Sequence, residues 1–164
     1  MTHSATPAPE WQVQCWFNTQ QAPSVASLRG KVIVLEAFQM LCPGCVSEGL
    51  PQAQRVRASF SPEQVAVVGL HTVFEHHQAM TPVALEAFLH EYRIGFPVAV
   101  DRPDPQGAIP CTMRDYAMQG TPTLVLIDTA GFIRQQYFGK VGDLVLGAQI
   151  ALLIAEAAPS SGAG

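Results

Sequence analysis

The chain has 164 residues, of which 48% are hydrophobic and 13% charged, and its formal net charge is −4. This size predicts a single domain, and the hydrophobic share is large enough to bury a core, which excludes wholesale disorder. The nine Lys and Arg residues form no basic run, so neither a nucleic acid nor an anionic membrane is expected as a partner. No uncharged apolar run reaches the ~18 residues of a membrane helix.

Both ends of the chain are rich in small residues, Pro and Ser or Thr. We therefore expect flexible tails at residues 1–9 and 158–164, around one domain at residues 10–157. The N-terminus has neither the positive segment nor the apolar segment of a signal peptide, which favours a cytoplasmic location. Thiols stay reduced in that compartment, so a close cysteine pair is expected to be catalytic or metal-binding.

Apolar patterning predicts the order of the elements. Strands are expected at residues 11–17, 32–38, 65–70, 96–100, 123–127 and 132–138, and helices at residues 45–60, 81–92, 112–118 and 144–156. The second strand is apolar on both faces apart from Glu36, as expected of a central strand. Pro51 is expected to kink the first helix. Strands that alternate with helices favour a layered α/β fold that ends in an antiparallel hairpin.

Cys42 and Cys45 stand where a buried strand ends and the first helix begins. The free N–H groups and the dipole at a helix start stabilise a thiolate, so Cys42 is the predicted nucleophile. Cys45, one turn later, is expected to resolve a mixed disulfide. A structural metal would need about four ligands, and because Cys15 and Cys111 are isolated, no metal is expected.

Two segments resemble the thioredoxin superfamily, within its TlpA-like and redoxin (AhpC/TSA-like) branches. They are RGKVIVLEAFQMLCPGC, which contains the cysteine pair, and GTPTLVLIDTAGFIRQQYFGKV near the C-terminus. The resemblance covers roughly residues 11–157. It implies a thioredoxin-like fold, in which a central mixed sheet is flanked by helices and carries an N-terminal strand extension. It also implies a cis Pro122 that faces the dithiol, with the Thr121 backbone beside it to dock an extended substrate chain.

Glu36 lies six residues before Cys42, where thioredoxins carry a buried acid. Burial in an apolar strand predicts a raised pKa for this carboxyl. The carboxyl could then exchange the proton of Cys45 through a water molecule. The alternative is that Glu36 reaches solvent at the sheet edge, or pairs with Lys31 or an arginine.

The motif departs from the family pattern at three places. Leu41 replaces the tryptophan that usually precedes the first cysteine. Pro43 and Gly44, which we assign to the substrate-binding surface, invert the thioredoxin dipeptide and so leave the reduction potential open. Pro51 falls six residues after Cys45, one more than in many relatives, so a bulge is expected in the first helix.

A polar loop after the third strand contains His71, Glu75, His76 and His77. These residues follow the carboxyl end of a strand, where α/β sheets bind ligands, and they could form a loop metal site. A solvated polar loop is the favoured interpretation, because adjacent histidines cannot both face one direction on a regular element.

The remaining candidates are two cysteines and three apolar residues. Cys111 is interpreted as a small buried thiol, with a second resolving or regulatory thiol as the alternative. Cys15 alternates with apolar residues and is expected to pack in the core. Met40, Leu41 and Phe74 are expected either to form an apolar rim for a partner chain or to belong to the core.

These features predict a thiol–disulfide oxidoreductase that acts on protein or small-thiol disulfides, in the reductive direction. No nucleotide or flavin fingerprint is present, so we expect no cofactor, an upstream dithiol reductant as the electron source, and a monomer. One alternative is a redox-sensing or binding module with little turnover. The other is a peroxiredoxin-like peroxidase, although its P-x-x-x-T-x-x-C pattern would need Pro and Thr at Leu35 and Gln39.

Overall fold

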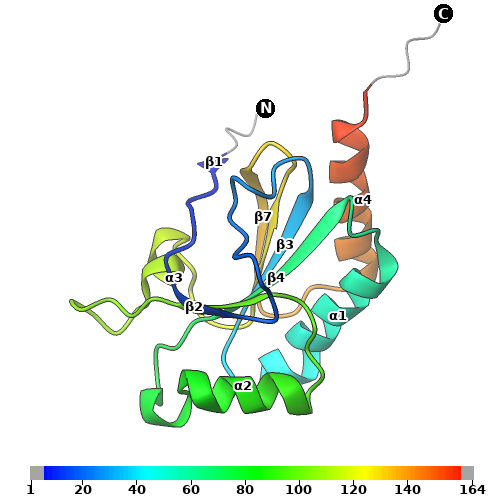
Figure 1. Cartoon of the computed structure of the whole chain (residues 1–164). Coiled ribbons are helices and arrows are strands. Elements are labelled where there is room, and N and C mark those ends of the chain that lie inside the picture. Colours follow the sequence, from blue (N-terminus) through cyan, green and yellow to red (C-terminus); the bar gives the residue numbers. More distant parts are fainter. Residues whose placement is uncertain (1–5, 160–164) are drawn as a thin grey trace, which may run out of the picture.

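The fold is built on one seven-stranded sheet with the order β1-β7-β6-β3-β4-β5-β2 (Figure 1). A computed structural model describes residues 6–159, so the outer parts of both expected tails, residues 1–5 and 160–164, lie outside the described residues. The strands are β1 (Thr6–Pro7), β2 (Val13–Phe17), β3 (Val32–Phe38), β4 (Val65–His71), β5 (Val98–Asp101), β6 (Thr123–Ile127) and β7 (Phe132–Phe138). The helical elements are the π-helical turn η1 (Cys45–Gly49), α1 (Leu50–Ser59), the 3-10 turn η2 (His77–Ala79), α2 (Pro82–Glu91), α3 (Cys111–Asp115) and α4 (Asp143–Ala157).

Strand β3 is the centre of the sheet, and all seven of its residues are buried. It runs parallel to β4 and antiparallel to β6, and β4 continues in parallel to β5. The remaining pairs, β6 with β7, β2 with β5 and β1 with β7, are antiparallel. The sheet is therefore mixed, and the predicted α/β fold with its closing hairpin and N-terminal strand extension is confirmed.

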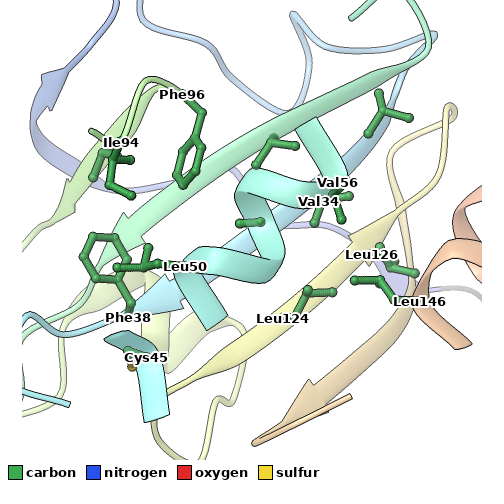
Figure 2. Close-up of a cluster of buried hydrophobic side chains, with 14 of the residues drawn as sticks. Val34, Phe38, Cys45, Leu50, Val56, Ile94, Phe96, Leu124, Leu126 and Leu146 are labelled. Carbon is green, nitrogen blue, oxygen red and sulfur yellow. The ribbon is translucent and has the colours of Figure 1, made fainter. Parts of the chain in front are cut away.

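Two hydrophobic clusters cover the two faces of the sheet. Alternate side chains of β3 point to opposite faces, so Val34 and Phe38 enter the first cluster, while Leu35 enters the second. Side chains of α1, α2 and α4 complete the first cluster, and Figure 2 shows Leu50 and Leu146 of this layer beside the strands. Glu36 lies two residues from both Val34 and Phe38 on β3. Its side chain therefore points to the same face of the sheet, toward the layer that contains α1 and α4.

The structure differs from the sequence prediction at two places. Thr6 and Pro7 form β1 against β7, so these residues do not belong to the expected N-terminal tail. The helix predicted over residues 45–60 is divided into η1 and α1, which confirms the expected bulge. Pro51 lies in the first turn of α1, just after the π-helical turn, so the helix is irregular immediately before this proline.

Helix α2 begins as predicted, with Thr81 as its N-cap and Pro82 in its first turn, and the Thr81 side chain accepts a hydrogen bond from Ala84 N. In the hairpin between β6 and β7, the Asp128 side chain accepts hydrogen bonds from Ala130 N and Phe132 N, both at 3.0 Å. Within residues 6–159, no helix combines the length and the apolar character needed to cross a membrane.

A buried carboxylate holds the short helix α3 against the sheet. Asp101, at the end of β5, is 3% exposed and accepts hydrogen bonds from Thr112 N at 2.8 Å, Met113 N at 2.9 Å and Thr72 Oγ1 at 3.0 Å. Burial nevertheless raises the pKa of Asp101, because desolvation outweighs the hydrogen bonds that lower it. One side chain thus joins β5, the end of β4 and the start of α3.

We predict that Asp101→Asn lowers the free energy of unfolding by about 1–3 kcal/mol, because the amide nitrogen turns a donor toward buried N–H groups. Urea unfolding followed by far-UV circular dichroism measures this change. Glu63→Gln, at an exposed position, is the control and should stay within about 0.5 kcal/mol of the unmodified protein. Equal midpoints for the two variants would contradict the role of Asp101.

Candidate active site

The two motif cysteines lie at the junction of β3 and η1, and they differ in exposure. Cys42 is half-buried, whereas Cys45 is completely buried, and both are free thiols. The Cys45 N–H lies 3.3 Å from Cys42 Sγ, and Cys42 Sγ is 3.5 Å from the carbonyl oxygen of Thr121. A disulfide from outside can therefore reach Cys42, while Cys45 stands behind Cys42.

The environment of Cys45 keeps it a thiol rather than a thiolate. Burial is the main cause that raises its pKa, and the neighbouring Cys42 raises it further. The Gln39 backbone and the Thr121 side chain act in the opposite direction, but they do not outweigh burial. Cys45 is thus protonated at neutral pH, and it has to lose this proton before it can attack a mixed disulfide.

Glu36 is the buried acid beside this pair. Its side chain is 1% exposed, and its Oε1 has no hydrogen-bond partner among the described residues. Burial raises the pKa of Glu36 well above its ordinary value, and the charge of Cys42 adds to this rise. The expected burial and raised pKa are confirmed, and the alternative of a solvated or Lys31-paired carboxyl is wrong.

The π-helical turn η1 brings its backbone directly against the Glu36 carboxyl. A Cβ atom on Gly49 would lie 2.1 Å from Glu36 Oε1 and 3.2 Å from Pro122 Cβ. A Cβ on Gly44 would lie 3.4 Å from Pro122 Cδ. The motif loop, η1 and the Pro122 loop thus meet over Glu36, and a side chain at position 49 would require the Glu36 carboxyl to move.

The loop before β6 supplies the other predicted substrate-binding residues. The Thr121–Pro122 peptide bond is cis, as the resemblance implies, and both residues are half-buried. Pro122 O accepts a hydrogen bond from Gly139 N at 2.9 Å, which holds the loop against the end of β7. No hydrogen bond is found for the Thr121 N–H within residues 6–159. Its carbonyl oxygen faces Cys42 Sγ, so this backbone lies beside the sulfur.

The surface around Cys42 has an apolar, exposed part. Pro43 is exposed and Leu41 is 58% exposed, so these two residues project from the motif loop. Met40 is buried and belongs to the core, and Phe74 is half-buried against the second cluster. Of the three apolar candidates near the motif, only Leu41 is therefore free to contact a partner chain.

Two residues that position the motif loop were not assigned this role from the sequence. Gln39 is 1% exposed, and its Oε1 accepts a hydrogen bond from Phe74 N at 3.2 Å. His71 is equally buried, and its Nε2 accepts one from Met40 N at 3.4 Å. Burial lowers the pKa of His71 to about 4, so its ring is neutral. The sequence signal that could have identified Gln39 and His71 is that each is a polar residue inside an apolar run.

The histidine loop and the two remaining cysteines do not form a common metal site in the described residues. His71 is buried, whereas His76 and His77 are exposed, and in the described part of the chain no group of three or more His, Cys, Asp or Glu side chains could hold a metal. Cys111 is buried, with its Sγ 3.8 Å from Pro103 O, and Cys15 packs half-buried against the first cluster.

A match to the AhpC/TSA family covers residues 5–136, which is most of the chain. The chain belongs to the AhpC/TSA family. A solved thioredoxin-like superfamily protein is 63% identical, with a TM-score of 0.92 over 94% of this chain and 100% of that chain. A thiol-disulfide isomerase from Corynebacterium glutamicum is 51% identical, with a TM-score of 0.88 over 92% of this chain and 97% of that chain.

A third solved structure, a thioredoxin-like protein in its oxidized form, is 21% identical, with a TM-score of 0.75 over 93% of this chain and 97% of that chain. At this identity it supports the fold alone. A comparison with curated proteins gave no match. This AhpC/TSA-family protein is a thioredoxin-like enzyme of the thiol–disulfide oxidoreductase type, as the sequence predicts.

We predict that Gly49→Ala destabilises this AhpC/TSA-family protein by about 1–3 kcal/mol, because the new methyl group overlaps the Glu36 carboxyl. In a Glu36→Ala background the same change should cost at least about 1 kcal/mol less, since the overlapping group is gone. Urea unfolding of the single and double variants measures this coupling.

Gly147→Ala in α4 is the matched control. A Cβ on Gly147 has no neighbour within 4 Å, so alanine should stabilise the helix by about 0.5–1 kcal/mol. Additive effects of Gly49→Ala and Glu36→Ala would contradict the close contact between η1 and the carboxyl.

Proposed function

We propose that Cys42 and Cys45 reduce disulfides of protein or small-thiol substrates. The observation that carries this proposal is the difference in exposure between two sulfurs that lie one helical turn apart. The Cys42 thiolate attacks one substrate sulfur, forms a mixed disulfide and releases the other substrate sulfur as a thiolate. The Cys45 thiolate then attacks Cys42 Sγ, which frees the second substrate thiolate and leaves the enzyme with a disulfide.

Glu36 supplies the base that the second step needs. Cys45 is buried and protonated, so its proton has to leave before the sulfur becomes a nucleophile. A carboxyl with a raised pKa accepts a proton at neutral pH more readily than an ordinary surface acid does. Because no hydrogen bond joins Glu36 to either sulfur in residues 6–159, we assign the transfer to a bridging water.

The substrate chain docks on the loop of Thr121 and Pro122. The Thr121 backbone lies beside Cys42 Sγ, and its N–H is available for a hydrogen bond with an extended substrate. Pro43 and Leu41, which are exposed on the motif loop, offer apolar contact on the other side of the sulfur. Gly44 keeps the motif loop close to Pro122 and thus shapes the same surface.

We place the reaction in the reductive direction, in a reducing compartment such as the cytoplasm, with an upstream dithiol as electron donor. The cysteine count supports this assignment, because four cysteines in 164 residues are few for a domain stabilised by disulfides. The described domain acts as one unit, and a monomer is sufficient for the proposed chemistry. An enzyme that isomerises disulfides would use the same first step.

A thiol peroxidase is less well supported by the geometry. Leu35 is buried in the second cluster, on the sheet face opposite to Glu36. The Gln39 side chain is engaged with the loop at Phe74 and Glu75. Neither residue offers the hydroxyl that orients a peroxide in peroxiredoxins. A redox-sensing module with little turnover has the same dithiol, and only a turnover measurement separates it from an enzyme.

We predict that Cys42→Ser lowers the rate of insulin disulfide reduction, with dithiothreitol as electron donor, by at least about 100-fold, to the uncatalysed background. Cys45→Ser should retain the first attack and accumulate a mixed disulfide that is visible by intact mass spectrometry. Cys15→Ser, outside the site, is the control and should keep turnover within about twofold. If the unmodified protein and Cys42→Ser share one rate, the catalytic proposal fails for generic substrates.

We further predict that Glu36→Ala slows the resolving step at pH 7 by about 100-fold or more, and the first attack by no more than about twofold. In the unmodified protein the resolving rate should rise with pH as Glu36 loses its proton. Because burial raises its pKa, this rise should be centred above the ordinary carboxyl range. Quenched-flow mass spectrometry of the mixed disulfide measures both steps, and equal slowing of the two would contradict the role of Glu36.

A further inference from the structure

A small cavity borders Glu36, and neither motif cysteine lines it. The cavity offers about 10 Å³ to the centre of a water molecule, which is roughly the space that one water needs. Glu36, Gly49 and Pro122 form its inner wall, and Glu48 and Lys140 lie at its outer side. It therefore connects the buried carboxyl with a charged part of the surface.

The inner end of this cavity is polar and lacks a protein partner. Glu36 Oε1 is fully buried and has no hydrogen-bond partner within the described residues. A buried polar atom of this kind is normally paired with protein or with an ordered water. The cavity size, the orphan oxygen and the charged outer side all suit one water molecule, which needs two to four polar neighbours.

An ion pair covers the outer side. Lys140 Nζ, on the loop between β7 and α4, lies 3.1 Å from Glu48 Oε1 on η1. The two side chains are 69% and 44% exposed, so they meet solvent on one side and the cavity on the other. In the same region, Gln52 donates to Val141 O at 2.7 Å, which ties α1 to the Lys140 loop.

A second ion pair extends this cover. Arg55 Nε lies 2.9 Å from Asp143 Oδ2, and the Gln52 amide donates to Asp143 Oδ1 at 2.8 Å. The pKa of Asp143 is lowered first by its hydrogen bonds from Arg55 and Gln52, and Lys140 adds a smaller effect. Glu48, Lys140, Arg55 and Asp143 thus form one cluster of two positive and two negative charges.

The charged and titratable groups around Glu36 come from few elements. The motif loop and η1 contribute Cys42, Cys45 and Glu48, and the loop after β7 contributes Lys140. The strand neighbours of Glu36 are uncharged, because Gly69 of β4 and Leu124 of β6 stand opposite it. The pair of Arg55 and Asp143 lies behind Gln52. Glu48 and Lys140 are therefore the charges at the solvent end of the cavity.

We propose that the cavity binds one water molecule that carries the Glu36 proton to and from solvent, and that the Glu48–Lys140 pair is the neutral cover of this route. This inference rests on the proposed function of Glu36 as a base. After the resolving step, Glu36 holds the proton of Cys45. That proton passes to the water, a proton of the water passes to the Glu48 carboxylate, and Glu48 releases it to solvent. No electron moves, and Glu36 ends as the carboxylate.

The test is the titration of Glu36, followed by the ¹³C signal of its side-chain carboxyl in the oxidised, glutamate-labelled protein. Lys140→Met leaves the Glu48 charge alone at the cavity, so the titration midpoint of Glu36 should rise by about half a pH unit. Glu48→Gln leaves the Lys140 charge, so the midpoint should fall by a similar amount. The double variant restores a neutral cover and should lie within about 0.2 pH unit of the unmodified protein.

The matched control is Arg134→Met. Arg134 Nη1 lies 2.6 Å from Glu156 Oε2. This ion pair joins β7 to α4, and neither residue lines the cavity. Its loss should leave the Glu36 midpoint unchanged. Shifts of the same sign for Lys140→Met and Glu48→Gln, or no shift in either, would overturn the proposal, because a mere loss of packing moves both in one direction.

Two further measurements separate the possible failures. A crystal structure at high resolution should place an ordered water within hydrogen-bonding distance of Glu36 Oε1, and a dry cavity would overturn the route. The resolving rate should follow the shifted Glu36 midpoints in its pH profile, and rates that ignore these midpoints would also overturn it. The carboxyl titration needs no substrate. Its result can therefore be interpreted even if the unmodified protein and Cys42→Ser show the same rate and the protein lacks reductase turnover.

Discussion

The buried carboxyl of Glu36 is the constraint around which the rest of the site is arranged. It occupies the central strand, on the face that packs against α1 and α4, and its Oε1 has no partner among the described residues. An acid in such a place favours its neutral form, because burial penalises the charged carboxylate. Gly49 of the turn η1 approaches this carboxyl closely, and Glu48 and Lys140 line the cavity that borders it.

The π-helical turn η1 brings Gly49 into contact with the Glu36 carboxyl. Pro51 falls one residue later after Cys45 than in many relatives. The π-helical turn accommodates this extra residue, because its hydrogen bonds span five residues rather than four. The turn sets the backbone of Gly49 on the carboxyl, while Cys45 at its start stays under Cys42. One local irregularity thus positions the Cys45 sulfur and closes the core over the acid.

Much of this arrangement was predictable from the residues, and the exceptions have physical causes. The strand with Glu36, the helix start at Cys45 and the helix over residues 82–91 follow from apolar runs, a helix mouth and a Thr-Pro cap. Strand β1 was not predictable, because two residues of a Pro-rich segment have no periodicity and are held by pairing to β7. Gln39 and His71 are marked in the sequence only as polar residues inside apolar runs, and Lys140 carries no local mark. Their roles depend on contacts between distant segments.

In the proposed mechanism, the resolving step depends on where the proton of Cys45 goes. Burial raises the pKa of both the Cys45 thiol and the Glu36 carboxyl, so each group favours its protonated form. In this mechanism, moving the Cys45 proton onto Glu36 creates one thiolate, and it requires that Glu36 be deprotonated beforehand. The half-buried Cys42 faces the substrate and cannot serve as that exit while a mixed disulfide covers it. The proposed route through the cavity on the far side of the carboxyl, between η1 and the loop after β7, would let the acid be reset without uncovering the sulfurs.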